Sequence, residues 1–501
     1  MASNSKRLKL CSHNEDRISG LPGAVLCHIL SFLSTREAVK TSVLSHRWKN
    51  VWASVPILDF DEEEYYLEYV FRTLSRPIGY DPDWFAQFVN RVLLFRCPGD
   101  IHRFRLVATR MHDVSLIYAW ISTAIRRNVV ELDLRVGTST DPHFEIPKRL
   151  FMCSTLVKLK LWLRRDISVI TPRSNCFPCL KFLHVTLLYP DSDSMEKLFS
   201  RFPVLEDLII DGNLEDASAF KLDISAPKLK RLQIRLTVHK FAMGSNNFVN
   251  YVCQIFINAD APDLEELDIC SDVLVSFSLK NANCLSKAEV DFSDVKELED
   301  HDCFLGLVDR IRQIFAGICD AKYLTVKAPI LTALDIGNQR LLPTLNNLSH
   351  LELQLETCRC LQSLTTWLKI SPNLEHLKIS TNREHLWFAD DYKYCDDDNE
   401  DILVHEWGAP EFANICLVSH LKTVCLWDFK GCPNDMEVAK YLVKHGKALN
   451  KVTIYTHFSE DKEMEIQSPI TLWSKFSKFL RGSKTCKIQF KTIVSDSSLG
   501  I

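Results

Sequence analysis

The chain has 501 residues, which corresponds to about three domains of ordinary size. Sixty lysines and arginines against 64 aspartates and glutamates leave a net charge of −4, a balance that argues against bulk binding to nucleic acid or to an anionic membrane. Hydrophobic residues make up 46% of the chain and charged residues 25%, as in an ordinary folded protein. Only 15 glycines are present, which disfavours glycine-rich phosphate loops and hairpin-rich β folds.

The cysteines and the N-terminus indicate a cellular compartment. Eighteen cysteines are scattered, mostly singly, and the positively charged N-terminus is not followed by the apolar segment of a secretory signal. Reduced thiols are therefore expected. The longest uncharged run, 241–259, is interrupted by Ser, Asn and Gln, so no membrane span is predicted. Residues 1–16 form a polar tail, in which Lys6-Arg7-Leu8-Lys9 is either a nuclear import signal or a solvated segment. We expect a soluble protein of the nucleus, the cytoplasm or both.

The first organised segment, 18–52, has a helical pattern. Pro22 occupies a position where a first-turn proline is tolerated, and apolar residues then recur at helical spacing through Leu33. Ser34 and Glu37 form a capping box that opens a second helix, and a third is predicted from Ser45. Three helices in about 35 residues bury too little surface to fold alone. Their apolar face must pack on the rest of this chain or on a partner.

This segment resembles an F-box: a Leu-Pro pair, an Ile-Leu-Ser helix, a Leu-Ser-x-Arg-Trp turn and a final Trp follow in the family's order. Gly23-Ala24 departs from the acidic residues usual there. The resemblance implies that residues 17–62 bind a Skp-type adaptor, and through it a cullin scaffold. The residues that carry this expectation are Leu21, Pro22, Leu26, Ile29, Leu30, Leu33, Val43, Leu44, Ser45, Arg47, Trp48 and Trp52.

The middle of the chain repeats the motif Pro-x-Leu-[Lys/Glu]-x-Leu. Five copies begin at Pro178, Pro203, Pro227, Pro262 and Pro372, and the last gap is long enough for four repeats. A period in the twenties with Leu-x-x-Leu-x-Leu is the signature of leucine-rich repeats. We therefore predict an irregular solenoid of short parallel strands and helices over 120–380. An ordinary α/β sheet with amphipathic helices is the alternative.

Each Leu-x-Leu is a short strand whose alternate side chains face outward. This face is either a solvated surface without a ligand or a concave protein-binding surface with alternating charge. In the copy after Pro203 the alternation predicts that Leu205, Leu208 and Ile210 face inward. The candidate target-binding residues are Phe182, His184, Asp207, Arg231, Gln233, Arg235, Glu266 and Asp268.

The C-terminal region resembles the FBD region of plant F-box proteins with leucine-rich repeats. The resemblance rests on Cys416-Leu417, Trp427, Ala439-Lys440-Tyr441-Leu442 and the segments around Gly482 and Phe490. The usual Val-Pro before Cys-Leu is replaced by Asn414-Ile415. It implies an FBD at 402–455 with an extension at 456–501. The acidic run 396–401 contains no mid-loop glycine, so an exposed loop is expected there rather than a calcium site.

No catalytic or metal signature is found. The common nucleotide-binding, hydrolase and zincin motifs are absent, and Cys176 and Cys179 form a single Cys-x-x-Cys without the second pair that a zinc site needs. We therefore expect no catalytic residue, no metal and no cofactor. A catalytic Cys–His pair stays open because such partners meet only in the fold.

Together these patterns predict an α/β protein: an N-terminal three-helix F-box, an irregular leucine-rich-repeat solenoid and a terminal FBD region. We expect a substrate-recognition adaptor of an SCF-type (Skp–cullin–F-box) ubiquitin ligase, with an unidentified target protein, no enzyme activity, and no nucleic acid or membrane as partner. Two alternatives stay open. One is a leucine-rich-repeat scaffold that acts outside any ligase, and the other is a thiol enzyme.

Overall fold

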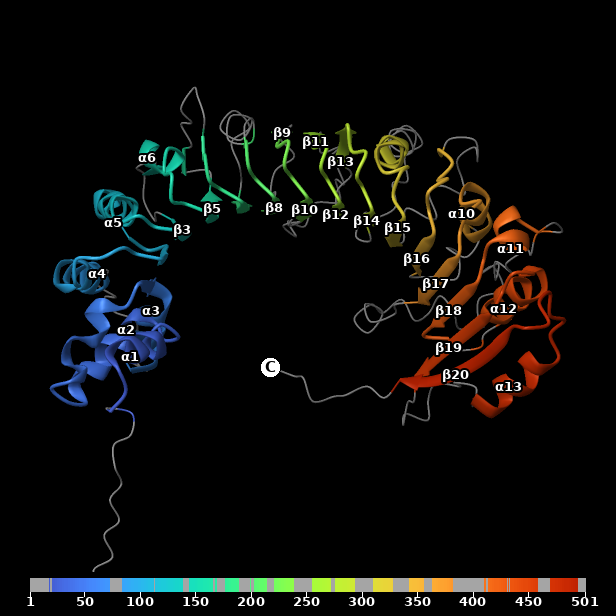
Figure 1. Cartoon of the computed structure of the whole chain (residues 1–501), viewed down its shortest axis with the longest axis horizontal. Helices are drawn as coiled ribbons and strands as arrows, with labels where there is room; N and C mark the ends of the chain where they lie inside the picture. Colours follow the sequence, from blue (N-terminus) through green and yellow to red (C-terminus); the bar gives the residue numbers. More distant parts are fainter. Residues whose placement is uncertain are drawn as a thin grey trace, which may run out of the picture. The chain divides into compact units, whose positions relative to one another are not determined.

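The structure is a computed structural model of the chain (Figure 1). The chain divides into two compact units, residues 1–162 with 166–168, and residues 163–165 with 169–501. The polar tail 1–16, the acidic run 396–401 and part of the predicted FBD lie outside the described residues. The structure describes residues 18, 20–72, 83–111, 113–137, 144–164, 167–168, 176–188, 199, 202–213, 220–237, 255–271, 275–292, 310–327, 342–355, 363–381, 410, 413–429, 431, 433–457 and 469–493.

The first unit begins with the predicted short helices. The hydroxyl of Ser34 accepts a hydrogen bond from the backbone N–H of Glu37 at 3.4 Å, so the serine half of the capping box is formed. The second predicted helix ends earlier than its apolar pattern suggests and continues as a 3-10 turn, and the third is itself a 3-10 helix. These elements are α1 (Gly23–Leu30), α2 (Thr35–Lys40), η1 (Thr41–Val43) and η2 (Trp48–Ser54).

The rest of the first unit is a parallel sheet with helices. Four strands pair in the order β1-β2-β3-β5, and two short strands, β4 and β6, pair separately. This parallel pairing begins well before residue 120, directly after the helical segment. The strands are β1 (Ile57–Asp61), β2 (Arg103–Ala108), β3 (Glu131–Val136), β4 (Phe144–Glu145), β5 (Lys158–Arg164) and β6 (Ile167–Ser168). The helices are α3 (Glu62–Arg72), α4 (Asp83–Phe95), α5 (Val114–Arg126) and α6 (Lys148–Phe151).

The second unit is dominated by a longer parallel sheet. Its strands pair in chain order without interruption into the C-terminal region, skipping only those of a second sheet. They are β7 (Phe182–Leu188), β8 (Asp207–Asn213), β10 (Arg231–Thr237), β12 (Glu266–Ser271), β14 (Lys287–Asp291), β15 (Tyr323–Lys327), β16 (His350–Leu355), β17 (His376–Thr381), β18 (Thr423–Trp427), β19 (Lys451–His457) and β20 (Lys487–Ile493).

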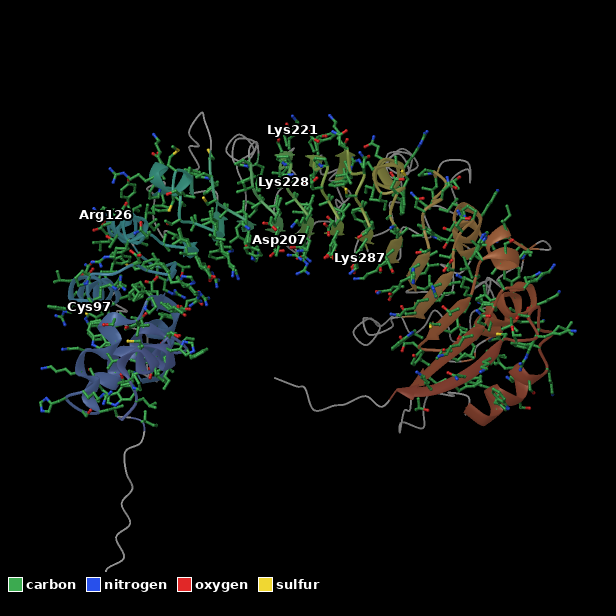
Figure 2. The ribbon with its side chains drawn as sticks, viewed as in Figure 1. Cys97, Arg126, Asp207, Lys221, Lys228 and Lys287 are labelled. Atoms are coloured by element: carbon green, nitrogen blue, oxygen red, sulfur yellow. The ribbon has the colours of Figure 1, made fainter. Side chains whose placement is uncertain are left out.

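A second, three-stranded parallel sheet pairs in the order β13-β11-β9. Figure 2 shows Asp207 and Lys287, on strands of the long sheet, on the side of this unit away from Lys221 of β9. The helices of the C-terminal part lie together on one side of the strands from β16 to β20 (Figure 1). The small sheet consists of β9 (Phe220–Ser225), β11 (Ile255–Asp260) and β13 (Val275–Lys280). The helices are a segment at 310–317, α10 (Leu364–Ile370), α11 (Ile415–Ser419), α12 (Pro433–His445) and α13 (Pro469–Ser477).

The repeat motif accounts for the core of the second unit. Leu205, Leu208 and Ile210 are all fully buried, so the predicted register of this strand is confirmed. Leu208 is level with Leu183 of β7 and Leu232 of β10, which are also buried. One repeat thus buries its leucines only against its neighbours, which is why a stack forms a continuous core.

The long gap between the fourth and fifth copies of the motif holds the expected number of repeats. Strands β14, β15 and β16 lie between β12 and β17 and pair in sequence, making four steps. At the two inward positions β14 carries Ala288 and Val290, and β15 carries Leu324 and Val326. These repeats fill the core with smaller residues and lack the proline, so the leucine motif does not detect them.

Candidate protein-interaction surfaces

The helical segment at the N-terminus has a small core of its own. Leu26 and Leu30 of α1 are buried with Ala38, Trp48 and Val55. This places three of the predicted adaptor-binding residues, Leu26, Leu30 and Trp48, inside the domain rather than on its surface. They can affect a partner only by holding the exposed residues in place.

Two further predicted residues pack against the edge of this core. Leu21 and Trp52 are half-buried and pack against the core cluster. The guanidinium of Arg47 donates a hydrogen bond to the backbone carbonyl of Leu21, and the indole N–H of Trp52 donates to the carbonyl of Lys49 at 3.1 Å. Arg47 therefore ties the Leu-Pro start of the segment to its third helix.

The opposite side of the segment exposes apolar side chains. Val43 keeps 85% of its surface exposed, Phe32 78% and Leu44 65%. Exposed apolar side chains concentrated in so short a segment are a usual mark of a protein-interaction site. The segment therefore buries one set of apolar side chains and leaves another set exposed. We call the exposed set the F-box apolar surface: Val25, Ile29, Phe32, Leu33, Val43 and Leu44.

Four of these six residues are among the predicted ones, namely Ile29, Leu33, Val43 and Leu44. Pro22, Ser45 and Arg47 are exposed as well. Sequence reasoning missed Val25 and Phe32 because it followed the apolar spacing through Leu26, Ile29, Leu30 and Leu33, of which two residues are buried and two exposed. Both missed residues are apolar, which is unusual for solvent-facing positions of an amphipathic segment.

The predicted target-binding residues fall into rows across neighbouring strands. Phe182, Asp207, Arg231 and Glu266 share one level of β7, β8, β10 and β12. Two residues further along each strand, His184 is level with Ile209, and Gln233 is level with Asp268. Arg235 of β10 is level with Asp211 on one side and Cys270 on the other. All eight candidates thus lie on the outward face of four adjacent strands.

The charges in these rows neutralise one another. The guanidinium of Arg231 donates to the carboxylate of Asp207 at 2.8 Å, and this contact raises the pKa of Arg231. The amide of Gln233 donates to Asp268, whereas Arg235 lies 4.0 Å from the same carboxylate. Much of the predicted alternation of basic and acidic strands is therefore a set of cross-strand contacts. Of the two arginines, Arg235 has the weaker contact and is the more available to a partner.

On the outward face of the later strands β15, β16 and β17, three ring side chains stack on one another. Tyr323 of β15 stacks on His350 of β16 at 4.3 Å between ring centroids, and His350 stacks on His376 of β17 at 4.2 Å. Burial lowers the pKa of His350, and the neighbouring imidazole lowers it further. His350 therefore resists protonation, and the stacked rings cover one another's faces.

Metal binding and thiol reactivity can be checked among the residues that the structure describes. No three His, Cys, Asp or Glu side chains there lie close enough together to hold a metal ion. Burial raises the pKa of the thiols of Cys270 and Cys416 to about 11, and a thiol protonated at neutral pH is a poor nucleophile. Within the described part of the chain, no helix is long and apolar enough to cross a membrane.

Comparison with known proteins identifies the parts of the chain. The F-box domain family matches residues 18–60, the leucine-rich repeats of the FBD-associated F-box protein At5g56370 match 117–292, and the FBD family matches 415–454. The F-box match includes the F-box apolar surface. The repeat match includes the strands that carry the eight candidates.

Whole-chain relatives come from Arabidopsis thaliana. The chain is 32% identical to the F-box/LRR-repeat protein At4g14096 over 366 residues, which cover 72% of each protein. It is also 32% identical to the F-box/LRR-repeat protein At4g14103, covering 73% of this chain and 92% of the relative. Identity to the F-box/FBD/LRR-repeat protein At1g13780 is 29%, over 94% of this chain and 97% of the relative. The chain belongs to the family of plant F-box proteins with leucine-rich repeats and an FBD region.

Proposed function

We propose that this chain is the substrate-recognition adaptor of an SCF-type ubiquitin ligase. Its F-box would bind a Skp-type adaptor that links to a cullin scaffold, and its strand rows would hold a target protein for ubiquitination. F-box proteins with leucine-rich repeats generally serve as such adaptors, and the family match supports this assignment.

The observation that carries the proposal is the F-box apolar surface. Side chains such as Phe32 and Val43 stay exposed although the same segment buries its own core completely. The buried centre of a protein interface is depleted of charge and rich in apolar side chains. A Skp-type partner that covers these six residues would remove their apolar area from water, which is the main favourable term in association.

The F-box is fastened to the sheet of its own unit. The backbone N–H of Asp59 in β1 donates to the hydroxyl of Thr35 at 2.7 Å, and the N–H of Cys97 donates to the carbonyl of Ala53 at 2.9 Å. Arg96 is buried and donates to the carbonyl of Val55. A partner on the F-box would therefore be held rigidly to the first strands and not through a flexible tether.

In this proposal the chain supplies proximity and no bond chemistry. Holding a target beside a transfer enzyme raises the effective concentration of one for the other. Catalysis belongs to the partner enzymes, so we propose no catalytic residue, cofactor, metal, nucleic acid or membrane for this chain. We place its action in the nucleus, the cytoplasm or both.

We propose the bounds 17–62 for the F-box, 120–380 for the repeats, 402–455 for the FBD and 456–501 for its extension. The eight row residues, with Arg235 foremost, are proposed to contact the target. Contacts of this kind contribute orientation and association rate more than affinity.

The test replaces two residues of the F-box apolar surface. Val43→Asp combined with Leu44→Asp puts two charges where the partner would bury apolar groups, and burying an unpaired charge is costly. We expect the full chain with both changes to lose capture of a purified Skp-type adaptor. Removing the first 60 residues is a poorer test, because it deletes most of β1, which pairs with β2 along its whole length.

A matched control uses the same chemistry elsewhere in the first unit. Leu94 and Phe95 of α4 are 74% and 66% exposed and lie outside the F-box. Leu94→Asp with Phe95→Asp should leave adaptor capture unchanged. Full capture by the Val43/Leu44 variant, with an unchanged circular-dichroism spectrum, would leave a scaffold outside any ligase as the better assignment.

A further inference from the structure

The outward face of the last strands differs from the neutralised rows nearer the N-terminus. Lysines here come from β19 and β20, and we call the set formed by Lys451, Lys487 and Lys491 the C-terminal lysine face. Lys451 is directly level with Lys487 on the next strand, and Lys491 is level with Tyr455. All three lysines are exposed. Like charges placed directly opposite each other on adjacent strands destabilise a sheet.

Two carboxylates of the preceding strands are paired with lysines outside the C-terminal lysine face. In the described residues, Glu352 contacts Lys378 at 2.7 Å and Glu375 contacts Lys422 at 2.7 Å. No carboxylate of the described residues lies within 4.0 Å of the ammonium groups of the C-terminal lysine face. Elsewhere on the same sheet, basic residues such as Lys327 and Arg231 have acidic neighbours on adjacent strands. Among the described residues, the lysines of these last strands therefore have no acidic partner to offset their charge.

Aromatic rings brace this face. Trp427 of β18 stacks on Tyr455 of β19 with 4.1 Å between ring centroids. The ammonium of Lys378 lies 5.0 Å from the Trp427 ring, and that of Lys491 lies 5.4 Å from the Tyr455 ring. The strand order β17, β18, β19, β20 sets these groups side by side as cation, ring, ring and cation. Lys491 is thereby held over the sheet, and the faces of both rings are covered.

The positive charge of this face reaches the neighbouring strand β18. Cys425 lies on β18, level with Lys378 of β17 and Thr453 of β19. Burial raises the pKa of the Cys425 thiol, and the nearby ammonium groups of Lys451, Lys378 and Lys491 oppose that rise without cancelling it. Lys451 and Lys491 are therefore close enough to act on the same neighbouring strand.

We propose that the C-terminal lysine face binds an acidic peptide segment of a partner protein, with its carboxylates placed on Lys451, Lys487 and Lys491. The amide of Gln489, exposed between the two lysines of β20, can hydrogen-bond to the backbone of such a peptide. Identifying the partner with a ubiquitination target rests on the proposed function, whereas the binding itself does not.

The covered rings favour a peptide over a nucleic acid. Single-stranded nucleic acids bind by stacking bases on open aromatic faces, and here Trp427 and Tyr455 cover each other on one side and are covered by lysines on the other. A protective role against edge pairing would explain lysines on the terminal strand. It does not explain Lys451, because β19 is paired on both sides.

The experiment measures direct binding by fluorescence anisotropy, with the full chain bound to its adaptor. The probe is a labelled peptide of about ten glutamates, long enough to cross strands that lie about 4.8 Å apart. We expect Lys451→Gln, Lys487→Gln and Lys491→Gln together to weaken binding about tenfold or more, and to flatten its dependence on salt.

A control with equal loss of charge uses ion-paired lysines of the same unit. Lys181 and Lys230 contact Glu206, and Lys228 contacts Asp263, each at 3.0 Å. Replacing these three with glutamine should leave the affinity within about twofold of the starting value, because two carboxylates offset most of their charge. Equal weakening by both triple variants would show a general charge effect and overturn the proposal.

Other occupants give distinct results. Tighter binding of an oligothymidylate than of the glutamate peptide would assign the face to nucleic acid and overturn the proposal. If neutralising the acidic run 396–401 strengthens peptide binding tenfold, the chain's own segment is the occupant and the proposal fails. The two assignments fail separately. Full adaptor capture by the Val43/Leu44 variant, with peptide binding that still depends on the C-terminal lysine face, would overturn the F-box assignment alone, whereas loss of adaptor capture with peptide binding insensitive to the three lysines would overturn this proposal alone.

Discussion

Substituting Leu44 should affect adaptor binding without affecting the stability of the F-box. It is 65% exposed, whereas Leu26 in the same segment is fully buried in the small core with Leu30 and Trp48. Leu44→Ala therefore removes apolar area that only a partner would cover. Leu26→Ala removes area that the domain itself already covers.

The size of the effect follows from the exposed fraction. Leucine to alanine removes three carbons, each worth about 0.8 kcal/mol when buried. Scaled by the 65% of Leu44 that is exposed, the loss on adaptor binding is about 1.5 kcal/mol, which is roughly tenfold in Kd. The free energy of unfolding should change by less than about 0.5 kcal/mol, as for most surface substitutions.

The assay is titration of the full chain with a purified Skp-type adaptor, by calorimetry, alongside a thermal melt of each variant. Leu26→Ala is the matched comparison, because a buried leucine to alanine change costs about 2–5 kcal/mol of stability. We expect Leu44→Ala to weaken binding and keep the melting temperature, and Leu26→Ala to lower the melting temperature.

Two results would refute this reasoning. Unchanged adaptor affinity in Leu44→Ala would mean that the partner does not cover this residue. A melting temperature lowered as far by Leu44→Ala as by Leu26→Ala would mean that Leu44 packs inside the domain.

Three further predictions concern the second unit. Leu208→Ala should clearly lower the melting temperature, because Leu208 is buried between two neighbouring strands. Asp207→Ala should change the melting temperature little, because a partly exposed ion pair contributes about 0–1 kcal/mol to stability. Equal effects of the two changes would contradict the strand register. Arg231→Glu with Arg235→Glu should weaken capture of target proteins and reduce its salt dependence, with adaptor capture as the unchanged reference. The lowered pKa of His350 means that the folded state binds fewer protons than the unfolded state. Stability should therefore fall as the pH drops through about 6.5, and His350→Gln should reduce the fall in melting temperature between about pH 7.5 and 5.5.

In the F-box, local sequence patterns predict the helices but not which side chains are exposed. The Leu-Pro start, the capping box and the helical spacing of apolar residues are local features, and they predict the helices and the family. The same pattern does not say which apolar residues stay exposed. Val25 is exposed and its neighbour Leu26 is buried. This difference in burial depends on the packing of α1 against η2 and the residues before β1.

In the repeats, the leucine motif predicts some strands and misses others. The five proline-containing copies predict parallel strands, their inward leucines and four repeat steps in the long gap, and the structure confirms all three. Strands with other inward residues, such as Ala288 in β14 or Phe104 in β2, escape the motif. A core position needs a suitable volume, which several apolar residues provide when their neighbours adjust.

The sequence by itself determined the class of fold and which side chains of each strand face outward, because these follow from spacing along one strand or one helix. Its motifs also carried the resemblance to the family. Only the tertiary structure decided which outward charges meet. Asp207 and Arg231 lie 24 residues apart and neutralise each other, while Lys451 and Lys487 lie level without an acidic neighbour among the described residues. Which strands become neighbours and which residues become level depend on the loops between strands and on the shared core. These are properties of the stack, and no single repeat contains them.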